Sequence, residues 1–159
     1  MFHPRLILAT LACLLSGCAS APTGKLTADY PDERAGIESR LSEIFDAAEK
    51  KDLERLDSYH FYGPKFTKFG TPAGRLDATT ARQEEHQGLS RISDLSMRAE
   101  DLKIDVFGDV GVATFTMHSD FKAGTNTFHQ KARSTLIFVK DKGFWKITHE
   151  HFSSPPAPK

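Results

Sequence analysis

Two histidines near the end of the chain have the spacing best suited to chemistry. His149 and His151 stand two residues apart in an alternating run that begins with Trp145 and Ile147. Successive side chains of a β-strand point to opposite faces, so this spacing predicts both imidazoles on the face of Trp145. Imidazole titrates near neutral pH and can serve as acid, base, hydrogen-bond donor or ligand. We therefore expect a pocket that is apolar at one end and polar at the other.

Three roles are open to these histidines. They fit the wall of a cavity, where hydrogen bonds to neighbours would hold the end of the sheet in shape. One of them could instead act as a general base. Two histidines on one strand face can also chelate a metal, with His118 or His129 as a third ligand, but periodicity does not show that these rings converge. We predict no metal site.

Other polar residues on the predicted sheet are further candidates. Arg133 would bind a carboxylate if it entered the pocket, and would be a solvated ion-pair partner if it lay outside. Asp120 shares the parity of His118 and either approaches the pocket or faces water. Tyr62 belongs to an aromatic segment, and we interpret His60 as a surface residue. The predicted ligand-pocket residues are His149, His151, Arg133, Trp145, Tyr62, His118 and Asp120.

The first half of the chain is predicted to be mainly helical. Apolar residues recur at helical spacing from Pro31 to about Lys51, and a short second helix follows Asp52. Residues 60–70 are rich in aromatics and interrupted by proline, which favours an edge strand or hairpin. A third helix is expected from Ala78, with Gly88 as its stop.

From Leu95 to Phe152 the apolar period changes to two, which predicts antiparallel strands. The parity reverses between Met97 and Leu102, so a β-bulge is expected around residues 99–101. A tight hairpin at residues 140–143 leads into the last strand. Helices followed by a run of antiparallel strands predict an α+β fold.

The first residues predict export and lipidation. A short apolar run from Leu6 to Leu15 suits a signal peptide and is too short to span a bilayer. Residues 15–18, Leu-Ser-Gly-Cys, resemble the lipobox of bacterial lipoproteins, which implies cleavage before Cys18 and lipid on its sulfur. The alternative is an ordinary secretory peptide with a chance cysteine. Ala19 resembles the sorting pattern for the outer membrane, with the domain facing the periplasm.

The expected organisation is a signal peptide over residues 1–17, a tether over 18–30, one domain over 31–154 and a loose tail over 155–159. No cysteine follows Cys18, so the domain is predicted to contain no disulfide and no thiol nucleophile. Without residues 1–17 the chain has 20 basic and 21 acidic residues, which makes nucleic acid an improbable partner. The sequence has no glycine-rich phosphate loop, nucleophile elbow or zinc-protease spacing, and we predict no cofactor.

The order of elements resembles the SnoaL-like branch of the nuclear transport factor 2-like superfamily. The resemblance is carried by residues 108–113, Gly-Asp-Val-Gly-Val-Ala, and by residues 143–153, Gly-Phe-Trp-Lys-Ile-Thr-His-Glu-His-Phe-Ser. It implies a cone-shaped bent sheet closed by helices around a pocket, and commonly a homodimer through the outer faces of the sheets. The superfamily includes ketosteroid isomerase, scytalone dehydratase, kinase association domains and pure binding modules, so the fold leaves the activity open.

We therefore predict a lipoprotein that binds a small, partly apolar molecule. An isomerase or dehydratase with a pocket histidine as general base is one alternative. A dimeric assembly module that works through its sheet face is another.

Overall fold

The computed structural model describes residues 24–70 and 74–155. The predicted signal peptide and Cys18 lie outside these residues. Among the described helices none is long and apolar enough to cross a membrane. The elements, in order, are α1 (Pro31–Glu49), α2 (Leu53–Ser58), β1 (Thr67–Phe69), β2 (Arg75–Leu76), α3 (Ala78–Ser90), β3 (Ser93–Val106), β4 (Val110–Ala123), β5 (Asn126–Asp141) and β6 (Phe144–Ser153).

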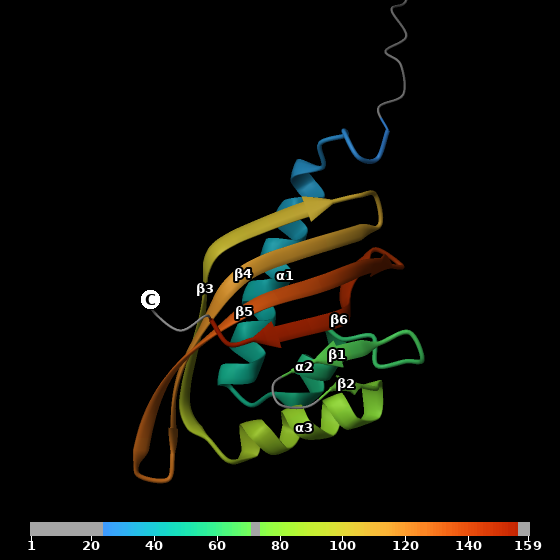
Figure 1. Ribbon diagram of the computed structural model, residues 1–159. Helices are drawn as coiled ribbons and strands as arrows, with labels where there is room; N and C mark the ends of the chain where they lie inside the picture. Colours follow the sequence, from blue (N-terminus) through green and yellow to red (C-terminus); the bar gives the residue numbers. More distant parts are fainter. Residues whose placement is uncertain (1–23, 71–73, 156–159) are drawn as a thin grey trace, which may run out of the picture.

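One six-stranded sheet in the order β2-β1-β6-β5-β4-β3 curves around α1 (Figure 1). All neighbouring strands are antiparallel except β1 and β6, which run parallel. Helix α3 covers the sheet near β1 and β2, and the β4–β5 hairpin extends beyond the helices (Figure 1). The predicted α+β cone is confirmed.

Helix α1 is the central element of the core. Pro31 stands in its first turn with two acidic residues, as the helix dipole favours. Its predicted stripe is buried against the sheet, with Ile37 and Leu41 almost fully enclosed. A Cβ built on Gly111 of β4 would lie 2.2 Å from Cδ1 of Ile37. A larger residue at position 111 would therefore require the side chain of Ile37 to move from its place between the helix and β4.

The predicted bulge in β3 is confirmed. The pairing of β3 with β4 shifts between Glu100 and Lys103, and Asp101 has a φ of 54°. A residue with positive φ in an antiparallel pair is typical of a bulge, and the extra residue reverses which side chains face inward.

A second bulge, which the alternating pattern did not reveal, lies in β6. Ile147 pairs with Phe138, whereas the preceding residue of β5, Ile137, pairs with His149, so Thr148 is an extra residue. Trp145 and Ile147 face the core on one side of the bulge. Beyond it the buried residue is Glu150. The prediction that the two histidines share the face of Trp145 is therefore wrong.

The segment before α3 also differs from its prediction. Residues 60–66 are mostly loop, and only Thr67–Phe69 form β1. This strand pairs antiparallel with β2 in a short hairpin at the edge of the sheet, so the hairpin alternative holds for the end of the segment. Gly88 does not stop α3, which continues to Ser90. A single glycine in a helix costs only about 1 kcal/mol, and contact with the rest of the fold outweighs that preference.

Candidate functional site

A buried carboxylate lies between two cations on the inner face of the sheet. Glu150 of β6 has a side chain only 5% exposed, and its Oε1 accepts a hydrogen bond from Nε2 of His60 at 3.1 Å. Its Oε2 lies 2.8 Å from Nζ of Lys68, which is 16% exposed. This second contact is a close ion pair, and Oε2 of Glu150 accepts no hydrogen bond from the described residues. The parallel register of β1 and β6 places Lys68 opposite Glu150.

The surroundings of His60 fix its charge. Its Nδ1 lies 3.0 Å from the carbonyl oxygen of Leu56, and its Nε2 faces the carboxylate of Glu150. Both partners only accept hydrogen bonds, so both ring nitrogens must donate and the ring is an imidazolium. Burial by itself would lower the pKa of His60, but the hydrogen bond and charge of Glu150 and the charge of Glu85 raise it to about 9.

Glu150 and Lys68, which form an ion pair with each other, also favour their charged forms. Burial opposes ionisation of Glu150, but the charge of Lys68 and the hydrogen bond from His60 lower its pKa. Burial also opposes the ammonium of Lys68, and the charges of Glu150 and Glu85 raise its pKa. We therefore expect all three groups to be charged at neutral pH.

Tyr62 joins this cluster to α3. Its hydroxyl donates to Oε2 of Glu85 at 2.8 Å, and its ring stacks on His60 with 4.9 Å between ring centres. Burial and the charge of Glu85 raise the pKa of Tyr62, so it stays a neutral donor. Two acids, Glu85 and Glu150, thus balance the two cations His60 and Lys68.

Lys68 and Glu85 reach the wall of a cleft of about 560 Å³ on the concave side of the sheet. Its size lies within the range of pockets that hold small molecules. The cleft is lined mainly by apolar side chains of the strands and of α3, with a few polar groups at its walls. The lining residues are Ala48, Lys68, Glu84, Glu85, Gly88, Leu89, Ile92, Leu95, Met97, Met117, Ser119, Phe121, Gln130 and Phe152.

His60, Glu85 and Glu150 place ligand atoms within 4.8 Å of one another, which is a spacing that could hold a metal ion. The carbonyl of Leu56 orients the ring of His60, as second-shell partners of metal ligands often do. The ammonium of Lys68 already neutralises Glu150, however, and His60 would have to lose its proton. The donor set is therefore better suited to its present ion pairs than to a metal.

The cluster is suited to binding rather than to proton transfer. A general base works best with a pKa near the working pH, whereas ion pairing holds the pKa of Glu150 low and those of His60 and Lys68 high. Lys68 has three N–H donors and directs one side to Glu150, so donors remain for an oxygen atom in the cleft. Its Nζ also lies 5.3 Å from the ring centre of Phe152.

The structure places the histidines that the sequence singled out on the outer face of the sheet. Nδ1 of His149 lies 2.8 Å from Oγ1 of Thr67 on β1, and His151 is exposed. Phe69 of β1 lies beside both rings. Burial and the charge of His151 lower the pKa of His149. Neither histidine lines the cleft.

The remaining candidates are also dispersed. Trp145 is buried at the other end of the sheet, where its Nε1 donates to Glu33 of α1 at 3.2 Å. Arg133 is exposed on the outer face, where its strand neighbour is Ser153. His118 is held on that face by Arg98 and Glu100. Asp120 accepts a hydrogen bond from His129 at 2.6 Å. Of the predicted pocket residues, Tyr62 alone belongs to the inner cluster.

The residues that the sequence analysis missed are His60, Lys68, Glu85 and Glu150. His60 is buried, contrary to its prediction as a surface residue. One signal was available in the sequence. Phe152 shares the parity of Glu150 and so lies on the face that was predicted to be solvated. An aromatic residue there indicates that a bulge turns this face inward before the end of the strand.

A comparison with protein families finds the SnoaL-like domain over residues 37–158. The chain belongs to the SnoaL-like family. This membership agrees with the α+β cone and with a cleft on the concave face. The search of curated proteins gave no match.

Solved structures show the same fold for the SnoaL-like chain. A proposed dehydratase of the NTF2-like family from Streptomyces avermitilis is 17% identical, with a TM-score of 0.74 over 80% of this chain and 100% of its own. An NTF2-like superfamily protein from Salmonella enterica is 18% identical, with a TM-score of 0.73 over 81% and 95%. The association domain of C. elegans CaMKII is 14% identical, with a TM-score of 0.65 over 78% and 97%.

Proposed function

We propose that this protein is a lipoprotein whose SnoaL-like domain binds a small, partly apolar molecule in the concave cleft. A polar oxygen of the ligand, from a carbonyl or carboxylate group, contacts the ammonium of Lys68. The observation that carries this proposal is the position of Lys68 at the wall of an otherwise mainly apolar cleft of about 560 Å³. Apolar surface supplies affinity in such a site, and a few polar groups fix the orientation of the ligand.

The lipid anchor at Cys18 is part of the same proposal. Its support is the apolar run that ends in Leu-Ser-Gly-Cys at residues 15–18. More than one acyl chain is needed for stable anchoring, and the mature lipoprotein would carry them on this one residue. The anchor would hold the domain at the outer membrane, facing the periplasm.

The geometry does not favour an isomerase or dehydratase with a pocket histidine as base. In the part of the chain that the structure describes, no histidine lines the cleft. His60 is buried, and both of its nitrogens already donate to oxygen atoms. The assembly module and the homodimer through the outer faces stay predictions.

Ligand retention by the cleft tests the proposal. The protein and two variants, Lys68→Met and Lys65→Met, would be purified from cell envelopes and compared by native mass spectrometry. We expect a bound small molecule in the unchanged protein and in Lys65→Met, because Lys65 is exposed and absent from the cleft lining. Lys68→Met should lose the molecule. It also removes one of the two cations beside Glu150, which keeps His60 as its partner, so thermal unfolding of the purified variant is measured to show that it is folded.

If Lys68→Met retains the ligand as well as the unchanged protein does, Lys68 does not belong to the binding site. A double variant, His149→Ala with His151→Ala, separates the two faces of the sheet. Loss of the ligand in this variant alone would place the site on the outer face and contradict the proposal.

A further inference from the structure

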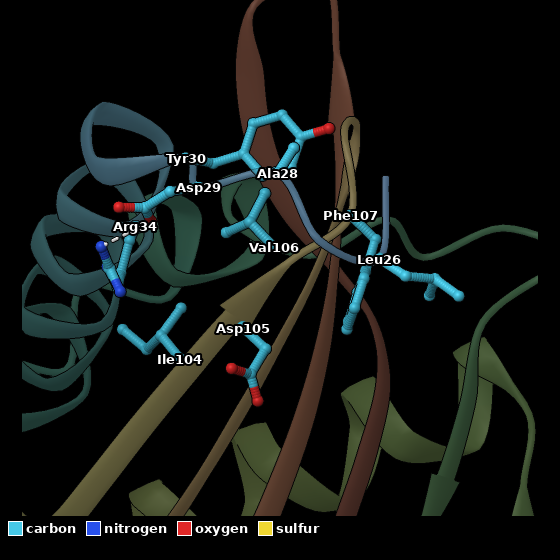
Figure 2. A pocket seen from close by; sticks show the side chains of 9 residues that line it. All are labelled: Leu26, Ala28, Asp29, Tyr30, Arg34, Ile104, Asp105, Val106 and Phe107. Carbon is cyan, nitrogen blue, oxygen red and sulfur yellow. Dashed lines mark hydrogen bonds and ion pairs between the residues drawn. The ribbon is translucent and has the colours of Figure 1, made fainter. Parts of the chain in front are cut away.

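Residues 24–30 hold the start of the described chain against one end of the domain. Lys25 passes over the β3–β4 turn, where a Cβ built on Gly108 would lie 3.4 Å from its Nζ. Leu26 and Tyr30 line a small pocket of about 100 Å³ with residues 104–107 of β3 and its turn (Figure 2). Asp29 accepts a hydrogen bond from Arg34 of α1 at 3.0 Å. The chain therefore enters the domain at the amino-terminal end of α1.

This end also presents the two most exposed of the large apolar side chains that the structure describes. Leu26 is 85% exposed and Phe144, at the start of β6, is 61% exposed. The backbone N–H of Lys140 donates to the carbonyl of Asp109 at 2.9 Å and so joins the β5–β6 hairpin to the β3–β4 turn. Leu26 extends away from the strand residues of its pocket (Figure 2). Both side chains expose apolar surface close to the point where the chain enters the domain.

The cleft lies at the opposite end of α1. Ala48, next to the last residue of the helix, lines the cleft, whereas Pro31 begins the helix beside the entry segment. A helix of 19 residues is about 28 Å long at 1.5 Å per residue. The entry segment and the cleft are therefore separated by roughly the length of α1.

We propose that the end carrying Leu26 and Phe144 rests on the membrane that holds the lipid, and that the cleft opens away from it. This inference rests on the proposed lipid at Cys18. The six Cα-to-Cα steps from Cys18 to Gly24 can span at most about 20 Å. The tether therefore keeps Gly24 within this distance of the bilayer surface, and with Leu26 and Phe144 at that surface the cleft lies about the length of α1 away from it.

The occupant of this surface is the lipid–water interface. Apolar side chains at an interface enter about 5–10 Å into the headgroup region, a depth within reach of a side chain at a turn. Lys25, Arg34 and Lys142 lie there with Asp29, Asp105, Asp109 and Asp141, so the charges nearly balance and the contact should depend little on anionic lipid. The cleft would then collect its ligand from the aqueous compartment and not directly from the bilayer.

Probe quenching in vesicles tests this orientation with the full lipidated protein. No cysteine follows Cys18, so a single cysteine introduced by Leu26→Cys, Phe144→Cys or Thr125→Cys carries the only free thiol of a lipidated chain. Each variant would be labelled with a fluorophore in phosphatidylethanolamine–phosphatidylglycerol vesicles that contain a nitroxide-labelled lipid. Thr125 is at the tip of the β4–β5 hairpin, at the cleft end (Figure 1). We expect several-fold stronger quenching at positions 26 and 144 than at position 125.

Equal or stronger quenching at position 125, in protein whose intact mass shows the lipid, would overturn the orientation and leave the anchor standing. Sedimentation with vesicles of the unchanged protein and of Cys18→Ser tests the anchor separately. If the two behave alike and no lipid mass is found, the anchor is wrong, and this inference falls with it. Ligand retention in the cleft is measured independently of both.

Discussion

Both faces of β6 carry ionisable residues, but the surroundings of these residues differ between the two faces. On the inner face Glu150 is enclosed by two cations and reaches the edge of a cleft. On the outer face His149 and His151 lie among exposed side chains, with Phe69 and Thr67 beside them. Thr148 is an extra residue at a bulge, so the inward-facing residue after Ile147 is Glu150 and the two histidines face outward. The comparison teaches that the chemical type of a residue does not show whether it belongs to a site.

Glu150→Gln should have the largest effect on stability. The substitution removes the carboxylate that pairs directly with the imidazolium of His60 and the ammonium of Lys68 in a buried place. Loss of one member of a buried ion pair costs about 3–5 kcal/mol. We expect this loss in the free energy of unfolding, measured with urea.

The matched control on the outer face is His151→Gln. An exposed substitution of this kind should change the free energy of unfolding by less than about 0.5 kcal/mol. Similar losses for both variants would show that the two faces do not differ as described.

The pH dependence of stability should separate the inner and outer histidines. The folded pKa of His60 is raised from 6.5 to about 9, so its contribution is complete below pH 6.5 and is lost as the pH rises through 9. The loss is of the order of 3 kcal/mol. The pKa of His149 is lowered, so its effect has the opposite sign: stability falls on the acid side, as the pH drops through and below 6.5.

Histidine ring protons followed by NMR against pH give both titrations directly. We expect one ring to titrate near pH 9 and to vanish from the spectra of His60→Gln, with the alkaline loss of stability vanishing too. A signal of His60 that titrates near 6.5 would contradict an imidazolium held by Glu150.

Deletion of Thr148 should cost less stability than Glu150→Gln. Without this residue, His149 follows Ile147 directly, and regular alternation still keeps Glu150 inside and His149 outside. The deletion removes the hydrogen bond from Thr148 to the carbonyl of Ile137 and the local bend of β6. We expect a cost of about 1 kcal/mol and an unchanged titration of His60. Loss of that titration would show that the bulge itself positions Glu150.

Much of the fold could be predicted because local patterns and packing agree there. The stripe on α1 shows the helix face that is buried, and Asp52 caps α2 through the backbone N–H of Arg55. The β3 bulge was predictable because apolar residues stand on both sides of it, so the change of parity is visible. In β6 the residue that faces inward beyond the bulge is the charged Glu150. The bulge was not predicted because the pattern of apolar residues does not include a buried carboxylate.

The sequence by itself determined the α+β order, the thiol-free domain and the helix that lies in the core, because these follow from composition and from the period of apolar residues. Only the tertiary structure decided the site. Residues 60, 68, 85 and 150 come from a loop, two strands and a helix, and their charges balance only when the fold brings them together. Electrostatic pairing acts through space, and residues 60 and 150 are 90 positions apart along the chain.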